Sequence, residues 1–553
     1  MGNGERKTLE GITVKDFKIQ VRDEIELAVR VYLPSADGEY PTLYCASPYQ
    51  YETDHLPPSS LFPWYEVGPF DWYVREQGYA FVHLDVRGSG QSGGDWDPFS
   101  PTEREDHREV LDWLMAQPWC NGKIGTYGQS YYAISQWMMA QCGSPHISCL
   151  GVFDGAGDMY RCMAYRGGIA NQFYSHWTNL VVHNHAVRLD TREEGRFINN
   201  PAAEVVRHQT DDQYWRDRSP VWGFENIDIP LYSIGVWGKR DLHLEGSLDG
   251  YRLAGGEKKL LALNPVNIVE AHELFAEVDF HRETMLPFYD YYLKGAENGW
   301  KENTPDVKYW VYGREAYRED TTWPPSAVSG EKVLYLGEGP TGSIHSLNDG
   351  SLDGSPSQND ASSTELSYPH MNWHIGNVAF GRFGPDAQRY NNTFTSAPLE
   401  EDLELVGNPK LLLFISSTQI DTDIVLKLQE QLPCSEEEIA AGKQPFSKLV
   451  TKGKLRASHR GLNEEWTEKL NRPFHEHRNL ENLVPGEIYE LEIGMIACAH
   501  MFKKGSRIRL DLSNADSNLT DHQLATLYHW EKVGTDTYYH SPASPSHLIL
   551  PTI

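Results

Sequence analysis

The stretch Gly125–Ala133 restricts the possible folds of this chain more than any other segment. A segment with apolar residues ends at Gly128, Ser130 follows two residues later, and apolar residues at helical spacing begin at once. This order is typical of a nucleophile elbow, a strand-to-helix turn so tight that its serine is strained and its hydroxyl exposed. Gly128 leaves room for such a turn, but Tyr132 stands where elbows usually have a second glycine. The alternative is an ordinary serine N-cap, so the interpretation depends on the rest of the chain.

The segments around this turn alternate between strands and helices. Residues 13–34 are expected to form a hairpin with one solvated face. Short apolar runs predict buried strands over 41–47, 79–85, 150–154, 230–235 and 259–263. Amphipathic patterns predict helices over 103–117 and 283–294. Strands that alternate with helices indicate a parallel sheet covered on both faces, and therefore an α/β fold.

A different pattern interrupts this alternation between residues 156 and 227. Aromatic and histidine residues crowd together there, and the periodicity is helical but patchy. An insertion after a sheet strand would lie over the carboxyl ends of the strands, where Ser130 is expected. We therefore interpret it as a helical cap that builds the substrate pocket. His183 and His185 could bind a metal ion, but no third ligand is evident, so no metal site is predicted.

The last part of the chain is predicted to be all-β, because it has many short alternating segments and few helical runs. Residues 346–365 are rich in Ser, Asp and Gly, which predicts a mobile loop or linker. The 553 residues are too many for one core. We expect an α/β core over 1–155 and 228–325, the cap over 156–227, and a β-sandwich or jelly roll over 326–553.

The composition argues against several classes of partner. The formal net charge of -29 would be repelled by nucleic acids and by anionic membranes. No apolar run reaches about 18 residues, so no membrane span is expected. The seven cysteines are odd in number and form no Cys-x-x-Cys, which favours buried free thiols in a reducing compartment. The first residues lack the apolar core of a signal peptide, so a cytoplasmic location is expected, and a homo-oligomer is compatible with the sequence.

The glycine-rich segment 88–94 follows a predicted strand and could cradle a phosphate group. It has neither the lysine of a Walker motif nor the spacing of a dinucleotide fingerprint. No nucleotide or other cofactor is therefore predicted.

Several motifs occur in the order and spacing of a known family. They are Arg22-Asp23, Ser47-Pro48-Tyr49, Asp85-Val86-Arg87-Gly88, Gln117-Pro118-Trp119 and Gly128-Gln129-Ser130-Tyr131. Together they resemble the X-Pro dipeptidyl-peptidase-like hydrolases (peptidase S15), which include the cocaine esterase and α-amino acid ester hydrolase type. Residues 453–460 and 502–510 look like the C-terminal domain of that family, so the resemblance covers nearly the whole chain.

The resemblance implies an α/β-hydrolase core with an inserted helical cap, followed by an all-β jelly roll of the galactose-binding-like type. It also implies a Ser–Asp–His triad, in which Ser130 matches the nucleophile and Asp241 the acid. The oxyanion hole would consist of the backbone N–H of Tyr131 and the hydroxyl of Tyr49. Asp241 could instead be a charge at a helix N-terminus, and Tyr49 could be a packed core tyrosine.

The histidine is where this sequence departs from the family. The family places it in a Pro-Trp-x-His string after the next strand, but Pro265-Val266-Asn267-Ile268 contains no histidine. The first histidine beyond is His272, which a slightly longer loop would bring to Ser130. His243 and His281 are weaker candidates. His272 could equally be a surface histidine between two glutamates.

These residues predict a serine hydrolase that cleaves an ester or amide bond of a small acyl substrate through an acyl-enzyme. The aromatic cap favours an apolar or aromatic acyl group. Two alternatives stay open. One is a repurposed hydrolase fold that acts as an acyl transferase, a cyclase or another non-hydrolytic catalyst. The other is a binding module without enzymatic activity, whose β-sandwich grips a sugar or a peptide.

Overall fold

The computed structural model describes residues 9–52, 65–182, 200–344, 346–381, 384–386, 390–441, 443–517, 519 and 532–553. The chain forms two compact units. The first comprises residues up to 162, 174–208 and 213–309, and the second comprises 163–173, 209–212 and 310–553. The finer division of the first unit into core and cap stays a prediction.

The first unit is built on one sheet with the strand order β1-β2-β4-β3-β5-β6-β9-β10-β11. β1 and β2 form an antiparallel hairpin and β2 pairs antiparallel with β4, whereas every later pair is parallel. The strands are β1 (Thr13–Gln20), β2 (Glu26–Leu33), β3 (Tyr40–Ser47), β4 (Ala80–Asp85), β5 (Cys120–Thr126), β6 (Ile147–Phe153), β9 (Leu231–Val236), β10 (Lys258–Leu263) and β11 (Val307–Val311). β4 and β9 are buried along their whole length, as expected of central strands covered on both faces.

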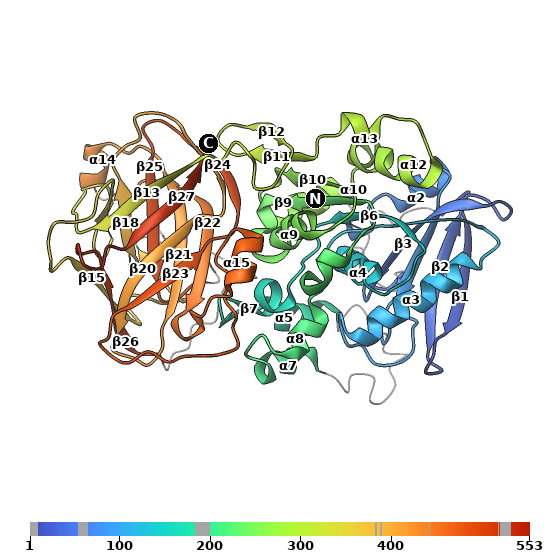
Figure 1. Cartoon of the computed structure of the whole chain (residues 1–553), viewed down its shortest axis with the longest axis horizontal. Helices are drawn as coiled ribbons and strands as arrows, with labels where there is room; N and C mark the ends of the chain where they lie inside the picture. The colour runs from blue at the N-terminus through green and yellow to red at the C-terminus, as the bar shows by residue number, and fades with distance from the viewer. Residues whose placement is uncertain are drawn as a thin grey trace. The chain divides into compact units, whose positions relative to one another are not determined.

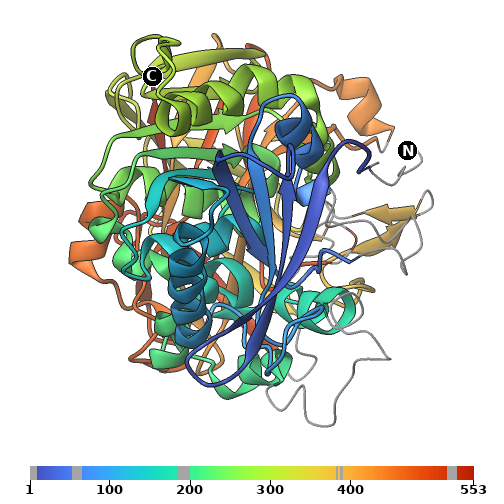
Figure 2. The ribbon, with the colours of Figure 1, turned by 90° about the vertical axis from the view of Figure 1, so that its right-hand side faces the viewer.

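Helices cover both faces of this sheet, with α3 and α4 on one side and α12 on the other (Figures 1 and 2). They are α2 (Phe70–Arg75), α3 (Pro101–Met115), α4 (Tyr131–Ala140), α9 (Glu245–Leu253), α10 (Ile268–Ala276), α11 (Val278–Phe280), α12 (Leu286–Lys294) and α13 (Trp300–Asn303). The start of α3 follows from its sequence. The Ser100 side chain accepts a hydrogen bond from the Glu103 N–H (3.2 Å), and Pro101 occupies the first turn, where no N–H is needed. This sheet and its helices confirm the predicted α/β architecture.

The segment expected to form the cap consists mainly of short helices. It contains η2 (Met159–Ala164), the strands β7 (Tyr165–Arg166) and β8 (Ile169–Ala170), α5 (Phe173–His176), η3 (Trp177–Val182), α7 (Pro201–Arg207), α8 (Gln213–Arg218) and η4 (Pro220–Asn226). Several of its aromatic side chains are buried, Trp215 completely. His183 and His185, which the sequence analysis considered as metal ligands, lie outside the described residues.

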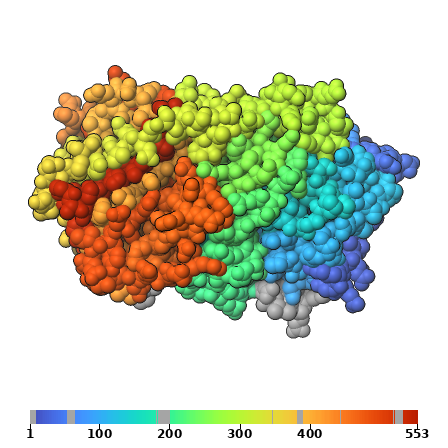
Figure 3. All heavy atoms as spheres, in the orientation of Figure 1, coloured from blue at the N-terminus to red at the C-terminus, as the bar shows by residue number. Residues whose placement is uncertain are grey.

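The second unit is mostly β. Its strands are β12 (Ala316–Asp320), β13 (Gly330–Gly337), β14 (Gly350–Asp353), β15 (Ser363–Tyr368), β16 (Ala379–Gly381), β17 (Gly384–Asp386), β18 (Asn392–Ser396), β19 (Leu403–Gly407), β20 (Lys410–Ser417), β21 (Asp423–Gln431), β22 (Ser447–Arg456), β23 (Tyr489–Gly494), β24 (Cys498–Phe502), β25 (Arg507–Ser513), β26 (Gly534–Tyr539) and β27 (His547–Thr552). The helical segments of this unit are α14 (Glu436–Ala440), η8 (Ala457–His459) and α15 (Glu464–Leu470). The C-terminal segment, dark red in Figure 3, lies beside the yellow segment that includes β13, because β13 and β27 pair antiparallel.

Two sequence expectations for the second unit have different outcomes. The predicted strands near 411, 423, 489 and 507 are confirmed as β20, β21, β23 and β25. The expectation that residues 346–365 form a loop or linker is wrong in part, because β14 lies within it and β15 begins at Ser363. β14 is short and pairs with β13 and β18, so its neighbours stabilise a segment whose own sequence favours a loop.

Two further properties concern the whole chain. All seven cysteines are free thiols, and five of them are buried. No helix among the described residues is long and apolar enough to cross a membrane.

A partly buried ion-pair network centred on Asp106 joins the β1–β2 turn, the loop after β4 and helix α3. Arg87 Nη2 lies 2.7 Å from Asp106 Oδ1, and Arg87 Nη1 lies 2.7 Å from Asp23 Oδ2. Arg22 Nη1 contacts the same Asp106 carboxylate at 2.8 Å. The side chain of Asp106 is only 2% exposed, so its charge depends on these two arginines. Three motif residues named in the sequence analysis therefore have a structural role.

We expect Arg87→Ala to lower the free energy of unfolding by about 3–5 kcal/mol, because it leaves the buried carboxylate of Asp106 with half of its partners. Chemical denaturation followed by tryptophan fluorescence measures this change. The matched control is Arg108→Ala, which removes an arginine from the exposed ion pair with Glu105 on the same helix and should change stability little. Equal stability of the Arg87→Ala variant and the unmodified protein would contradict the role given to this network.

Candidate active site

Ser130 lies in a tight turn between β5 and α4. Its φ is 63° and its ψ is -115°, a conformation that costs a non-glycine residue about 1–3 kcal/mol. Gly128 precedes it with a φ of 118°, and a Cβ added to Gly128 would lie 2.4 Å from the Cβ of Tyr132. Tyr132 therefore packs where a side chain at residue 128 would stand, which explains why glycine is needed there. The geometry is that of a nucleophile elbow with a tyrosine in place of its second glycine.

His243 is the histidine that the structure brings to this serine. It belongs to the π-helix η6 (Arg240–Leu244), and its Nε2 lies 3.2 Å from Ser130 Oγ. The other ring nitrogen, Nδ1, is buried and has no hydrogen-bond partner among the described residues. Burial, and then the nearby Lys239 ammonium, hold the pKa of His243 well below its ordinary value. His243 is therefore a neutral imidazole at physiological pH.

The other two histidine candidates have different partners. His272 lies in α10, whose N-cap Asn267 accepts hydrogen bonds from the N–H groups of the first turn. Its Nε2 is 3.2 Å from Glu66 Oε1 and 3.4 Å from Lys239 Nζ. His281 packs in the core and its Nε2 lies 2.7 Å from the Phe275 carbonyl oxygen. The segment after β10 runs directly into α10, and His272 lies in that helix with its Nε2 beside Glu66.

Asp241 lies on the same π-helix, two residues before His243, and is half-buried. Its carboxylate does not contact His243 Nδ1, since that atom has no partner in the described part of the chain. The predicted pairing of an acid with the base is therefore not formed at His243.

Three buried ionisable residues that the sequence analysis did not select lie near the elbow: Glu66 and Asp154 contact Gln129, and Lys239 pairs with Asp154. Glu66 is 1% exposed, and Lys239 Nζ lies 3.2 Å from Asp154 Oδ2 in a pair that is almost completely buried. Burial raises the pKa of Glu66 to about 8, against the opposing effects of Lys239 and of a hydrogen bond from Ser130. Burial also raises the pKa of Asp154, and Lys239 opposes that rise. Position in the sequence could have indicated two of these residues, because Asp154 and Lys239 follow the carboxyl ends of buried strands.

Tyr49 and Tyr131 lie together, with ring centroids 6.1 Å apart. The Trp177 Nε1–H donates a hydrogen bond to the Tyr49 hydroxyl oxygen (2.8 Å), so Tyr49 accepts one bond and keeps its own proton to donate. Burial, and then the charge of Glu66, raise the pKa of Tyr49, which keeps that proton in place. Tyr131 is the first residue of α4, where backbone N–H groups have no intrahelical partner. Both groups can act as donors toward a developing oxyanion.

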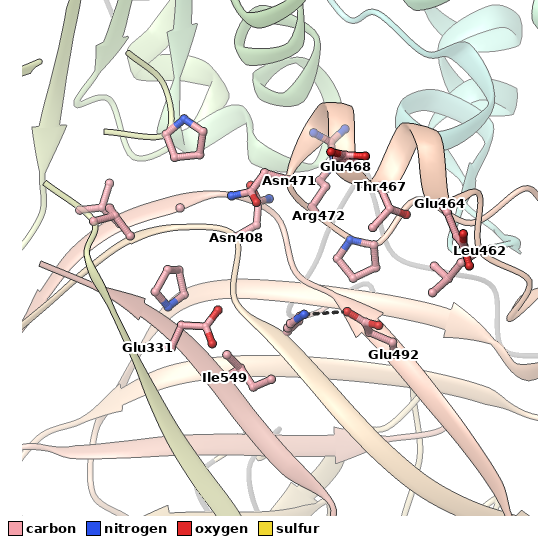
Figure 4. Close-up of a pocket in the computed structure, with 17 residues that line it drawn as sticks. Glu331, Asn408, Leu462, Glu464, Thr467, Glu468, Asn471, Arg472, Glu492 and Ile549 are labelled. Atoms are coloured by element: carbon pink, nitrogen blue, oxygen red, sulfur yellow. Dashed lines mark hydrogen bonds and ion pairs between the residues drawn. The ribbon is translucent and has the colours of Figure 1, made fainter. Parts of the chain in front are cut away.

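A separate pocket of about 490 Å³ lies in the mostly-β unit (Figure 4). Its lining includes Glu331, Glu464, Glu468 and Arg472, and an ion pair joins Lys410 Nζ to Glu492 Oε1 at 2.8 Å. No serine, cysteine or histidine is among the residues that line it, so it lacks a serine–histidine or cysteine–histidine pair. Among the described residues, no three His, Cys, Asp or Glu side chains are arranged to hold a metal ion.

Comparisons with known proteins identify the family of the chain. The family model of the X-Pro dipeptidyl-peptidase (S15 family) matches residues 23–266, and the model of the X-Pro dipeptidyl-peptidase C-terminal non-catalytic domain matches 298–549. Cocaine esterase from Rhodococcus sp. is 26% identical to the chain, and the match covers 97% of both proteins.

Solved structures extend the comparison to the fold. A CocE/NonD family hydrolase from Staphylococcus aureus superposes with a TM-score of 0.78 at 25% identity, over 98% of this chain and 94% of the other. An α-amino acid ester hydrolase superposes with a TM-score of 0.70 at 19% identity, over 99% and 98% of the two chains, and shows the same fold. On the two family matches, the relatives and the serine elbow, the chain belongs to the X-Pro dipeptidyl-peptidase-like and cocaine esterase-type family of α/β-hydrolases and is a serine hydrolase of ester or amide bonds.

Proposed function

We propose that Ser130 is the nucleophile of this hydrolase, that His243 is the histidine that acts with it, and that Tyr49 and Tyr131 form the oxyanion hole. The observation that carries the proposal is the 3.2 Å contact between Ser130 Oγ and His243 Nε2 at a strained elbow. The proposal keeps three residues of the sequence analysis and replaces His272 with His243. Asp241 stays a prediction that has no contact with His243 Nδ1 to support it.

The reaction begins when Ser130 Oγ attacks the carbonyl carbon of the substrate while its proton passes to a neighbouring basic group, which then gives that proton to the leaving alcohol or amine. The carbonyl oxygen becomes an oxyanion, which accepts hydrogen bonds from the Tyr49 hydroxyl and the Tyr131 N–H. The alcohol or amine then leaves with a proton, and an acyl-enzyme remains on Ser130. Water attacks the acyl-enzyme in the same way and releases the acid, which restores the serine.

Aromatic side chains next to the elbow favour a particular acyl group. The ring centroids of Phe99 and Tyr131 lie 4.4 Å apart. The ring centroid of Trp177 lies 5.8 Å from that of Tyr131 and 5.7 Å from that of Trp96. These rings are buried against one another and make the surroundings of the elbow apolar, which would favour an apolar or aromatic acyl group there. We therefore propose a small ester or amide with an apolar or aromatic acyl group as the substrate, in keeping with the ester named for the cocaine esterase relative.

Three predictions of the sequence analysis belong to this proposal. We propose that the mostly-β unit is a jelly roll of the galactose-binding-like type, which its many antiparallel strand pairs support. A cytoplasmic location and a homo-oligomer stay predictions from the sequence.

Ser130→Ala is expected to lower kcat for p-nitrophenyl acetate by at least about 10⁴-fold, because the attacking oxygen is lost. The measurement is background-corrected release of p-nitrophenolate, with mass spectrometry of the products and labelling by a fluorophosphonate probe. The matched control is Ser135→Ala, since Ser135 is a buried serine on the same helix and should be dispensable. Turnover by Ser130→Ala at the normal rate would refute the proposed nucleophile, and a transferred or cyclised acyl product in place of the free acid would refute hydrolysis.

Tyr49→Phe is expected to lower kcat by about 10²–10³-fold with a smaller change in KM, because one oxyanion donor is removed and the ring is kept. Steady-state kinetics with the same ester measures both constants. Tyr44→Phe is the control, because the Tyr44 hydroxyl is paired with His107 at 3.1 Å and does not serve the site. If the two variants have equal kcat values, Tyr49 is a packing residue only.

A further inference from the structure

The hydrogen-bond partners of His243 indicate which of its nitrogens carries the proton. A neutral imidazole has one N–H and one acceptor nitrogen, and buried N–H groups without a partner are rarer in folded proteins than buried acceptors without one. Nδ1 of His243 is buried without a partner among the described residues, whereas Nε2 lies 3.2 Å from Ser130 Oγ. The proton therefore belongs on Nε2, and His243 donates a hydrogen bond to the serine oxygen. In this tautomer His243 does not accept the serine proton.

The Ser130 hydroxyl proton then needs another acceptor, and Glu66 is in place to be that acceptor. The Gln129 N–H donates a hydrogen bond to the Glu66 carbonyl oxygen at 3.0 Å, which holds Glu66 beside the elbow, and hydrogen bonding with Ser130 is among the effects that lower the Glu66 pKa. Glu66 Oε1 is held by His272 Nε2 at 3.2 Å. Glu66 Oε2 is buried and has no hydrogen-bond partner in the described part of the chain, so it can take a proton. Catalytic hydrogen bonds often become shorter only when the substrate binds.

The surrounding charges favour a proton on Glu66 in the resting enzyme. Lys239 is paired with Asp154 at 3.2 Å, so these two charges cancel. His272 and His243 are both neutral, because burial and the Lys239 charge hold their pKa values well below the ordinary value. The buried group is therefore uncharged overall when Glu66 is protonated, and ionised Glu66 adds one negative charge in a site with little water.

We propose that Glu66 is the general base and general acid of Ser130, and that His243 is a donor that fixes the serine oxygen. This inference rests on the proposed role of Ser130 as nucleophile. As the bond from Ser130 Oγ to the acyl carbon forms, the O–H bond breaks and the proton moves to Glu66. Glu66 gives that proton to the alcohol or amine as the bond from the acyl carbon breaks. In deacylation Glu66 takes a proton from water and returns one to Ser130 Oγ. His272 is a positioning residue, because it contacts Glu66 and not the reacting atoms.

The pH dependence of the whole enzyme distinguishes the two possible bases. A carboxyl group acts as a base only when it is ionised, and burial raises the pKa of Glu66 to about 8. If Glu66 is the base, kcat/KM for p-nitrophenyl acetate rises with pH and levels off above about pH 8. If His243 is the base, the profile is flat between pH 6 and 9, because His243 is neutral throughout. A flat profile in the unmodified enzyme would overturn the inference without any variant.

Two near-isosteric variants test the inference independently. We expect Glu66→Gln to lower kcat by about 10²–10⁴-fold and to abolish the rise with pH. His243→Gln keeps an N–H donor for the Ser130 oxygen. We therefore expect its kcat to fall by less than about tenfold and its kcat/KM still to rise with pH. Glu66→Asp keeps the carboxyl group, so its kcat should be higher than that of Glu66→Gln. Its kcat/KM should still rise with pH, but over a different pH range. Full activity of Glu66→Gln, or a loss in His243→Gln as large as that in Ser130→Ala, would overturn the assignment.

Two controls separate this inference from the proposed function and from misfolding. Asp536→Asn changes another buried carboxyl group, whose pKa burial raises to about 7, and should leave the rate and its pH profile unchanged. Loss of the pH rise in Asp536→Asn would assign that rise to a group other than Glu66 and overturn the inference. Thermal unfolding confirms that each variant is folded. If Ser130→Ala keeps its activity, the nucleophile assignment fails, whereas an inactive Ser130→Ala with a fully active Glu66→Gln defeats the Glu66 assignment alone.

Discussion

The turn that holds Ser130 at a φ of 63° is the constraint on which the rest of the site depends. Hydrogen bonds from two directions stabilise it: the Ser130 N–H donates to the Phe153 carbonyl oxygen (3.2 Å), and the Gln129 N–H donates to the Glu66 carbonyl oxygen (3.0 Å). The strain of about 1–3 kcal/mol persists because these bonds and the packing of Tyr132 against Gly128 determine the backbone path. The bond to Glu66 also ties the segment that carries this residue to the elbow. The turn that exposes the hydroxyl therefore also places a carboxyl group beside it.

Buried charge gives the site its second constraint. A Ser–His–Asp triad stabilises the imidazolium ion with a carboxylate on Nδ1. At His243 that position has no partner among the described residues, and both burial and the charge of the Lys239 ammonium oppose protonation of the ring. An imidazolium ion at His243 would therefore be destabilised, whereas a proton on Glu66 would relieve a buried negative charge. The arrangement of charge around Ser130 favours a carboxyl group over an imidazole as the place where the proton rests.

The sequence predicted the elements that have strong local signals. The apolar strands of the core, helix α3 and the elbow with Gly128 and Ser130 follow from periodicity and glycine placement, and the structure contains them. β14 was missed because pairing with its neighbours, and not its own sequence, makes it a strand. The contact of His243 with Ser130 was missed because it depends on the π-helix η6, in which His243 is buried. A π-helical turn has no periodic sequence pattern that would predict it. Glu66 was missed because its contacts with His272 and Ser130 are made between segments far apart in the chain.

Most of the residues that carry the family resemblance are not the residues that surround the Ser130 hydroxyl. Arg22, Asp23 and Arg87 belong to the ion-pair network around Asp106, which joins the first hairpin to α3. These ion pairs stabilise the fold, so the fold does not depend on which group acts as the base. In this chain the segment after β10 enters α10, and its His272 contacts Glu66, so the elbow and its network are compatible with another group accepting the serine proton. Glu66 can be that group, because its backbone is bonded to the elbow itself, so changes in the loop after β10 leave it in place.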